Sequence, residues 1–348
     1  MTGRRVLLLS ASMGAGHDAA AAELARRLTA RGDEPVLRDL LALLPAGTGR
    51  LLRTSYGQML HHAPWLYQGI YGHFFEPPAR RRTRADPVVV LAERPVRRLL
   101  ADLAPDAVVA TFHLAAQVTG RLRSRGQLDV LSTVLVTDLV VHALWVHPGN
   151  DRHLCLHPSA VQEAGARGAR DPLEVGPLVR PDFRRPAQQP SWEVLAVPAG
   201  RAMVVLTAGA WGVGDLRRCA HVVARTGRYV PVVLCAHNQR LLDTLRREPG
   251  VVALGWRDDV PALVRTAHAV VQNAGGLSCW EALTAGRPVI TYRPIPGHGR
   301  AAAERLDRLG LVPWARDDDD LVRMLDGCSS AATESDGRPV QDAAQLIA

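Results

Sequence analysis

A histidine and two glycines stand where an apolar run gives way to an alanine-rich stretch. The run 5–10 is typical of a buried strand, and a helix is expected to begin at Asp18 as its N-cap. Gly14 and Gly16 permit a tight turn between them. His17 then falls at the carboxyl edge of a sheet, where ligands bind. A neutral imidazole there could take a proton from a hydroxyl, or it could merely cap the turn.

A second glycine turn lies in the segment "VVQNAGGLSCWEAL", between an expected strand and an expected helix. Glycines at a helix N-terminus expose backbone N–H groups, and the helix dipole favours an anion there. The pattern therefore predicts a phosphate cradle. Its residues are Ala274, Gly275, Gly276, Leu277 and Ser278.

A carboxylate follows this cradle by about one helical turn. Glu281 would repel phosphate, so its carboxylate is better suited to the vicinal hydroxyls of a sugar. In other nucleotide sites an acidic residue binds the ribose hydroxyls in this way. The alternative is structural, because Ser278 and Glu281 have the spacing of a capping box. The spacing does not choose between the two interpretations.

The elements around these residues alternate between short apolar runs and helical stretches, and they do so twice. Such alternation predicts an α/β protein with two parallel sheets. A proline-rich stretch separates the halves. The predicted division is an N-terminal domain over 1–182, a linker over 183–200, a C-terminal domain over 201–325 and a tail over 326–348.

Composition narrows the function classes. The 348 residues carry a net charge of +8, and all 42 basic residues are arginine. This excess suits phosphates or an anionic membrane surface, while no motif typical of nucleic-acid binding accompanies it. Five scattered cysteines do not suit a disulfide framework. No apolar run is long enough for a membrane span or a secretory signal, so we expect a cytoplasmic protein.

Six blocks of the sequence carry a resemblance to a known family. They are "SASMGAGHDAAAAELARRL", "VLVTDLVVHALWVHPGNDRHLCLHPSA", "LEVGPLVRPDF", "LTAGAWGVGDL", "VVALGWRDDVPALVRTAHAVVQNAGGLSCWEAL" and "GRPVITYRPIPGHGR". In this order they resemble the GT-B glycosyltransferases, in the branch of monogalactosyldiacylglycerol synthase, the processive diacylglycerol glucosyltransferases and the related lipid-II-forming N-acetylglucosaminyltransferase. The resemblance implies two facing Rossmann-like domains and a UDP-sugar donor.

The resemblance also implies residue roles. His17 becomes a candidate base and Asp138 a second one, each on the acceptor side. The other acceptor residues would be Gly14, Gly16, His142 and Trp65. The phosphate cradle and Glu281 would bind the diphosphate and the ribose. The remaining donor residues would be Gly209, Gly212, Gly214, Trp256, Arg257, His298 and Gly299.

One departure from the family concerns the donor sugar. Lipid-glycosylating relatives usually follow "IPG" with a glutamine and an acid, whereas this chain has His298-Gly299-Arg300. Those positions influence which sugar is accepted, so galactose, glucose and N-acetylglucosamine all stay open.

An aromatic segment over 55–84 ends in a cluster of arginines. Apolar rings beside basic residues suit interfacial binding to an anionic membrane, and Trp65 is among them. The alternative is a packed helical hairpin with a charged end.

Two other clusters are interpreted as structural. The histidines at 142, 147, 153 and 157 match no zinc spacing, so we expect no metal there. The acidic run 317–320 suits a helix N-terminus.

The expected reaction is a single displacement with inversion, from a UDP-sugar to a hydroxyl of a diacylglycerol-like or polyprenyl-linked lipid. No cofactor is expected beyond the donor, and contact with the inner face of the membrane would be peripheral. Three alternatives stay open: a soluble natural-product acceptor, a UDP-sugar epimerase on the same fold, and a nucleotide-sugar binder without catalysis.

Overall fold

The computed structural model describes residues 3–72, 87–184, 197–198, 200–328 and 340–347. The chain divides into two compact units, Met1–Leu178 with Pro339–Ala348, and Val179–Arg338. The boundary thus precedes the expected linker, and 179–182 belongs with the second unit rather than the first. Most of 183–200 lies outside the described residues.

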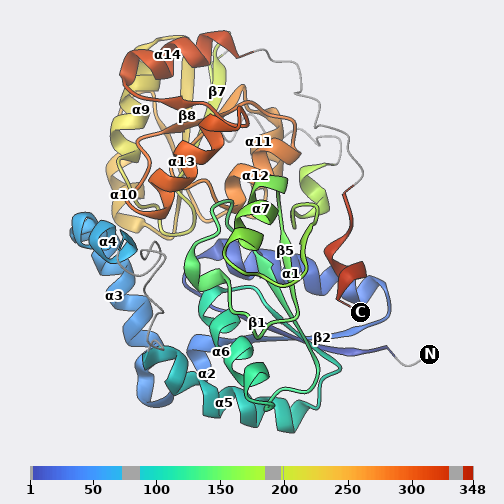
Figure 1. Cartoon of the computed structure of the whole chain (residues 1–348). Helices are drawn as coiled ribbons and strands as arrows, with labels where there is room; N and C mark the ends of the chain where they lie inside the picture. Colours follow the sequence, from blue (N-terminus) through green and yellow to red (C-terminus); the bar gives the residue numbers. More distant parts are fainter. Residues whose placement is uncertain (1–2, 73–86, 185–196, 199, 329–339, 348) are drawn as a thin grey trace. The chain divides into compact units, whose positions relative to one another are not determined.

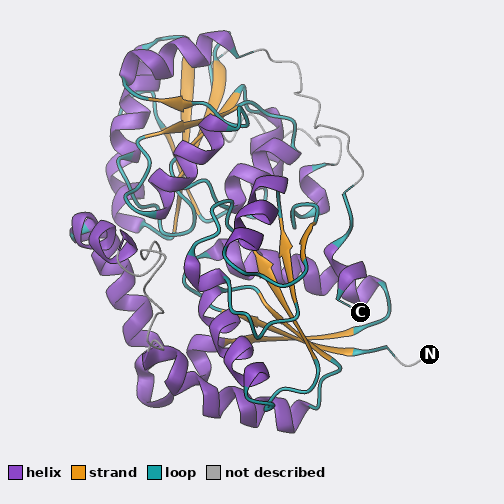
Figure 2. Ribbon diagram, in the orientation of Figure 1, coloured by secondary structure: helices purple, strands orange, loops and turns teal. Residues whose placement is uncertain are grey.

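The first unit is built on a six-stranded parallel sheet in the order β2-β1-β3-β4-β5-β6. Its central strands are almost fully buried and rich in Val, Leu and Ala, as a parallel sheet covered on both faces requires. Helices flank the strands (Figures 1 and 2). The strands are β1 Arg5–Ser10, β2 Glu34–Asp39, β3 Ala107–Ala110, β4 Leu131–Val136, β5 Arg152–Cys155 and β6 Pro172–Glu174.

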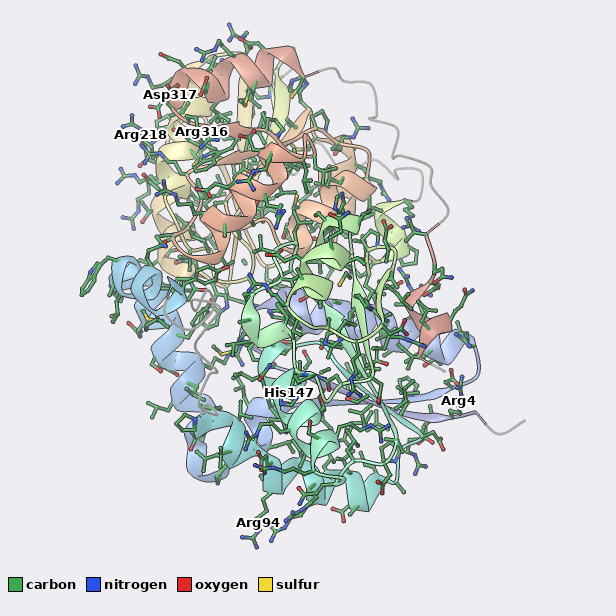
Figure 3. The ribbon with its side chains drawn as sticks, viewed as in Figure 1. Arg4, Arg94, His147, Arg218, Arg316 and Asp317 are labelled. Atoms are coloured by element: carbon green, nitrogen blue, oxygen red, sulfur yellow. The ribbon has the colours of Figure 1, made fainter. Side chains whose placement is uncertain are left out.

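Two helices of this unit, α3 and α4, include the first part of the aromatic segment 55–84. The described helices of the unit are α1 Ala15–Ala30, α2 Leu40–Leu43, α3 Thr48–His62, α4 Pro64–Ile70, α5 Pro87–Leu103, α6 His113–Ser124 and α7 Pro158–Ala166. Residues 73–86 of that segment, with its arginine cluster, lie outside the described part. The side chain of Arg94 projects outward from α5 (Figure 3).

The second unit repeats the architecture with the strand order β12-β11-β10-β7-β8-β9, again all parallel. The strands are β7 Ala202–Thr207, β8 Tyr229–Ala236, β9 Val252–Gly255, β10 Ala269–Gln272, β11 Val289–Tyr292 and β12 Trp314–Ala315. The helices are α9 Leu216–Arg225, α10 Gln239–Leu245, α11 Val260–Thr266, α12 Leu277–Thr284, α13 His298–Arg308 and α14 Asp318–Gly327. The predicted pair of parallel-sheet domains is confirmed.

Each sheet reverses its strand order once. The reversal lies between β1 and β3 in the first sheet and between β7 and β10 in the second. Loops leave such a pair in opposite directions, which opens a crevice at the carboxyl ends of the strands where ligands bind. The fold thus marks the turns after β1, β3, β7 and β10 as candidate sites before any side chain is considered.

The C-terminal segment returns to the first unit. Val175 and Gln341 form a parallel β-bridge, and Arg27 of α1 pairs with Asp342 at 3.3 Å. Backbone carbonyls of the segment accept hydrogen bonds from Arg31 and Arg152. Ala343, Ala344 and Ile347 are buried against this unit.

None of the described helices is both long enough and apolar enough to cross a bilayer.

Candidate active site

The first turn of α1 carries His17. The helix begins at Ala15 with Gly14 as N-cap, so the expectation that Asp18 caps it is wrong. The carboxylate of Asp18 instead accepts a hydrogen bond from the Ser10 hydroxyl at the end of β1, at 2.8 Å. The helix thus begins three residues before Asp18, and His17 in its first turn follows β1 at the reversal of strand order.

The imidazole of His17 is held on three sides. Its Nδ1 lies 2.9 Å from the hydroxyl oxygen of Thr137, which directly follows β4. Its ring meets Phe112 edge to face at 5.1 Å, and the Trp145 ring lies 6.1 Å away. These contacts commit Nδ1 to the protein. Nε2 is therefore the nitrogen available to a ligand within the described residues.

Asp138 is anchored beside this histidine. The indole N–H of Trp145 donates to its Oδ2 at 2.9 Å, and Nε2 of His142 lies 3.7 Å from the same oxygen. His142 is only 3% exposed and meets the His113 ring edge to face. It therefore lies beside Asp138 in the interior of the unit, and its expected contact with an acceptor stays a prediction. Burial lowers the pKa of His113 to about 3, which keeps that ring neutral.

The remaining histidines have structural partners. His157 caps α7 by accepting from the Ser159 N–H at 3.1 Å, and the Nδ1 of His153 lies 3.0 Å from the Arg170 carbonyl. Burial lowers the pKa of His147 to about 4. Among the described residues, no three His, Cys, Asp or Glu side chains are grouped as a metal ion would require. The acidic run acts as predicted, with Asp317 capping α14.

In the second unit, the glycine turn after β7 packs against the end of β10. Gly209, Gly212 and Gly214 all have positive φ angles. A side chain at Gly214 would lie 2.3 Å from the amide nitrogen of Asn273, which donates to the Val213 carbonyl at 2.8 Å. Backbone and amide therefore meet directly at the reversal of strand order in this sheet.

The turn after β10 brings two helix N-termini together. Gly275 has a φ of +68°, and a Cβ there would lie 2.6 Å from Cβ of Ala302 in α13. A Cβ at Gly299 would lie 2.8 Å from the Asn273 carbonyl oxygen. Both glycines are thus required by close packing. As a result, the positive dipole ends of α12 and α13 lie side by side.

The N–H groups at this turn are not all available to a ligand. The side-chain oxygen of Gln272 accepts from the N–H groups of Ala274 and Gly275. Those two were expected to bind phosphate, but here they fix the turn. The first N–H groups of a helix have no intrahelical partner. At α12 these belong to Leu277 and Ser278, preceded by Gly276 as the N-cap residue.

Glu281 lies on α12 in a partly buried position. Burial raises the pKa of its carboxyl group to about 7, and the Arg180 guanidinium opposes part of this rise. No capping-box hydrogen bond between Glu281 and Ser278 is found among the described residues. The carboxylate therefore lacks the structural role that was the alternative, and near neutral pH it changes charge readily.

The raised pKa of Glu281 predicts that the difference in unfolding free energy between wild type and Glu281→Gln changes with pH. The folded carboxyl group holds its proton more tightly than the unfolded one, so wild type loses stability as pH rises from about 4.5 to about 7. Glu281→Gln cannot lose a proton. It should gain up to about 3 kcal/mol relative to wild type between pH 4.5 and 8. Urea unfolding of both proteins at the two pH values measures this, and an unchanged difference would contradict it.

Trp256 and Arg257 follow β9 at the same edge of the second sheet. The Trp256 ring is exposed and stacks on His237 at 4.4 Å between centroids, with 8° between the planes. The Arg257 guanidinium forms a bidentate pair with Asp259 at 2.6 and 2.5 Å. The charge of Arg257 is therefore balanced by Asp259, while Trp256 offers a flat apolar face.

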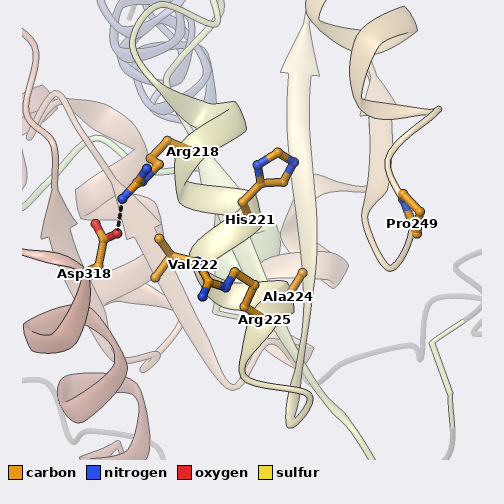
Figure 4. Close-up of a pocket in the computed structure, with 7 residues that line it drawn as sticks. All are labelled: Arg218, His221, Val222, Ala224, Arg225, Pro249 and Asp318. Atoms are coloured by element: carbon orange, nitrogen blue, oxygen red, sulfur yellow. Dashed lines mark hydrogen bonds and ion pairs between the residues drawn. The ribbon is translucent and has the colours of Figure 1, made fainter.

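A cavity of about 320 Å³ lies elsewhere on this unit, lined by residues of α9 together with Pro249 and Asp318 (Figure 4). Its cations largely have acidic partners: Arg218 pairs with Asp318 at 2.5 Å, and His221 with Glu248 at 2.9 Å. None of the predicted site residues lines it. The cavity therefore does not belong to the candidate site.

Sequence reasoning missed several residues of the site. Thr137 precedes Asp138 at the same strand end, so its position alone was a usable signal. Gln272 and Trp145 gave no such signal, because their roles depend on contacts that the fold creates.

Comparisons with known proteins indicate the family that the chain resembles. Residues 17–173 match the family model described as monogalactosyldiacylglycerol (MGDG) synthase. The chain is 23% identical over 338 residues to a processive diacylglycerol beta-glucosyltransferase of Bacillus mycoides (strain KBAB4). The aligned region covers 91% of this chain and 83% of that protein.

Solved structures show the fold. MurG of Acinetobacter baumannii is similar with a TM-score of 0.58 at 15% identity, over 99% of each chain. Os79 of O. sativa, in complex with UDP, has a TM-score of 0.62 at 14% identity, over 93% of this chain and 90% of its own. The chain is a glycosyltransferase of the GT-B fold, and it resembles the family of monogalactosyldiacylglycerol synthase and the processive diacylglycerol glucosyltransferases.

Proposed function

We propose that this glycosyltransferase moves a hexose or N-acetylhexosamine from a UDP-sugar to a hydroxyl of a diacylglycerol-type lipid, with inversion at the anomeric carbon. The observation that carries the donor half is the pairing of two helix N-termini, α12 and α13, at the reversal of strand order in the second sheet. Such a place favours a diphosphate.

The residues around this point suit the rest of a nucleotide sugar. Glu281 offers a carboxylate one turn into α12, where ribose hydroxyls could donate to it. The exposed ring of Trp256 offers an apolar face for the nucleobase of the donor. The similar Os79 structure contains UDP. The proposal includes no cofactor, because the helix N-termini would hold the charge that grows on the departing UDP.

The reaction then needs only a base and an aligned acceptor. Nε2 of His17 takes the proton of the acceptor hydroxyl. The freed oxygen forms a bond to the anomeric carbon from the side opposite UDP. The bond from that carbon to the diphosphate breaks, and its electron pair leaves with UDP. The proton on His17 later passes to water.

The acceptor half is supported by the names of relatives and by one surface. The matching family and the Bacillus relative are named for diacylglycerol lipids. On α3 and α4, Leu51, Trp65 and Leu66 are exposed, and Trp65 keeps 74% of its surface. Exposed Arg50 lies on the same helix as Leu51. Apolar and basic side chains together suit an anionic lipid surface.

Membrane contact through α4 can be tested with a matched pair of variants. Trp65→Ser with Leu66→Ser should weaken binding to phosphatidylglycerol vesicles about tenfold or more, since each buried apolar side chain contributes roughly 1.5–3 kcal/mol. Val90→Ser with Leu91→Ser removes similarly exposed side chains from α5, at 48% and 45%, and should leave binding unchanged. Vesicle flotation measures both, and equal effects of the two pairs would contradict the proposal.

The function itself is tested by UDP release from a panel of UDP-sugars, each with and without diacylglycerol in mixed anionic vesicles. We expect release with one sugar that depends on the lipid. Release that requires no acceptor and leaves the nucleotide on an altered sugar would point to an epimerase. Tight UDP binding without release would point to a binder, and release only with soluble acceptors would overturn the lipid assignment.

A further inference from the structure

Thr137 stands between the two residues considered as the base. It directly follows β4 and precedes Asp138, and its hydroxyl oxygen lies 2.9 Å from Nδ1 of His17. We propose that Thr137 is a positioning residue that holds His17 in the tautomer with the proton on Nδ1, so that the lone pair of Nε2 faces the acceptor. The inference rests on the proposed role of His17 as base.

The backbone around Thr137 is fixed by the fold. Strand β4 pairs with β3 on one side and with β5 on the other, and residues 132–136 are buried. The His17 ring in turn meets Phe112 edge to face and lies beside Trp145. Both partners of the 2.9 Å contact therefore have little freedom, and the contact persists without help from a ligand.

Only one direction of this hydrogen bond is compatible with catalysis. If the hydroxyl donated to Nδ1, the proton of the neutral imidazole would lie on Nε2, which could then take none from an acceptor. That bond would also be lost on protonation, because an imidazolium has two N–H groups and no acceptor. If the hydroxyl accepts from Nδ1–H, the same bond serves the neutral ring and the imidazolium.

A carboxylate performs this task in the Ser-His-Asp triad. Here both carboxylates that neighbour the pair in sequence have other partners. Asp18 accepts from the Ser10 hydroxyl at 2.8 Å, and the Oδ2 of Asp138 receives the Trp145 indole N–H at 2.9 Å and lies 3.7 Å from Nε2 of His142. His113, a further titratable group near the ring, is neutral because burial lowers its pKa to about 3. The hydroxyl of Thr137 is thus the group at Nδ1.

The first readout does not depend on activity. In protein labelled with ¹⁵N-histidine, and with His17→Gln to assign the signal, long-range ¹H–¹⁵N spectra report the tautomer of His17. We expect the Nδ1-protonated form in wild type and a mixture of tautomers in Thr137→Val. An Nε2-protonated ring in wild type would overturn the inference even if the transferase activity is established.

The second readout is kinetic. Thr137→Val should lower kcat by about tenfold or more, within the roughly 10²–10⁴-fold that general-base catalysis supplies, and leave both KM values within about twofold. Thr137→Ser should restore kcat, because it returns the hydroxyl. Thr133→Val is the matched control and should keep kcat, since Thr133 is a buried threonine within β4 whose hydroxyl has no hydrogen-bond partner among the described residues. An unchanged kcat in Thr137→Val would reject the role.

If no donor and acceptor pair gives turnover, the proposed function fails while the tautomer spectra still decide the inference. If turnover is found and the spectra show the wrong tautomer, the inference fails and the function stands.

Discussion

Replacing His17 with alanine should lower kcat by roughly 10²–10⁴-fold, the contribution typical of a general base. The change removes Nε2, the nitrogen that the contact of Nδ1 with Thr137 leaves for the acceptor. It should leave folding nearly intact, because His17 lies in the first turn of α1 and is only partly buried. UDP affinity should not change, since the donor residues are in the other unit.

Two further variants make the result specific. Asp138→Asn keeps the shape of the second candidate base and removes its charge. A smaller loss of kcat in Asp138→Asn than in His17→Ala would assign the base to His17, and the opposite order would assign it to Asp138. His221→Ala controls for removal of an imidazole, because His221 lies on α9 beside Glu248 and outside the site. It should retain full turnover in a UDP-release assay.

Gly275→Ala should have the second large effect, on both stability and donor binding. At φ +68° a side chain is strained, and the new methyl group would lie 2.6 Å from Cβ of Ala302. Together these costs amount to about 2–5 kcal/mol of unfolding free energy. The turn cannot relax without moving α12 away from α13, so UDP should bind much more weakly. Denaturant unfolding and calorimetric titration with UDP measure the two effects.

Variants of two other glycines separate the effect of backbone strain from the effect on UDP binding. Gly310 has nearly the same φ, +67°, but open space around it, so Gly310→Ala should show the conformational cost alone, about 1–2 kcal/mol, with normal UDP binding. Gly276 has negative φ and open space. Gly276→Ala should therefore fold normally and weaken UDP binding by placing a methyl group at the N-terminus of α12. Normal binding in both Gly275→Ala and Gly276→Ala would remove this turn from the donor site.

The longer strands could be predicted from the sequence because their physical cause is local. Strand β1 lies at the expected 5–10, and β10 directly precedes the second glycine turn, where a strand was expected, since each is a short apolar run followed by glycines. Strands β6 and β12 could not be predicted, because three and two residues at a sheet edge carry no periodic signal. Helix α5 contains Pro95, a residue that normally argues against a helix, yet the helix continues through it.

The candidate site could be predicted by residue type but not by contact. His17, Asp138 and Gly275 follow strand ends, and the carboxyl edge of a parallel sheet follows from the alternation of elements. The start of α1 at Ala15 was not foreseen, because Asp18 resembles an N-cap residue in the sequence but accepts from the Ser10 hydroxyl in the fold. The partnership of Thr137 with His17 joins residues 120 positions apart, and only the register of β1, β3 and β4 brings them together.

The return of the C-terminal segment to the first unit has a consequence for the order of synthesis. Ala343, Ala344 and Ile347 are buried there, and Arg27 and Arg31 of α1 bind the same segment. A ribosome makes these residues only after it has made the whole second unit. While the second unit is being translated, the nascent first unit must leave the corresponding apolar surface of α1 uncovered. During that interval a chaperone could bind this surface. In a chain truncated near 178 the surface would stay exposed permanently.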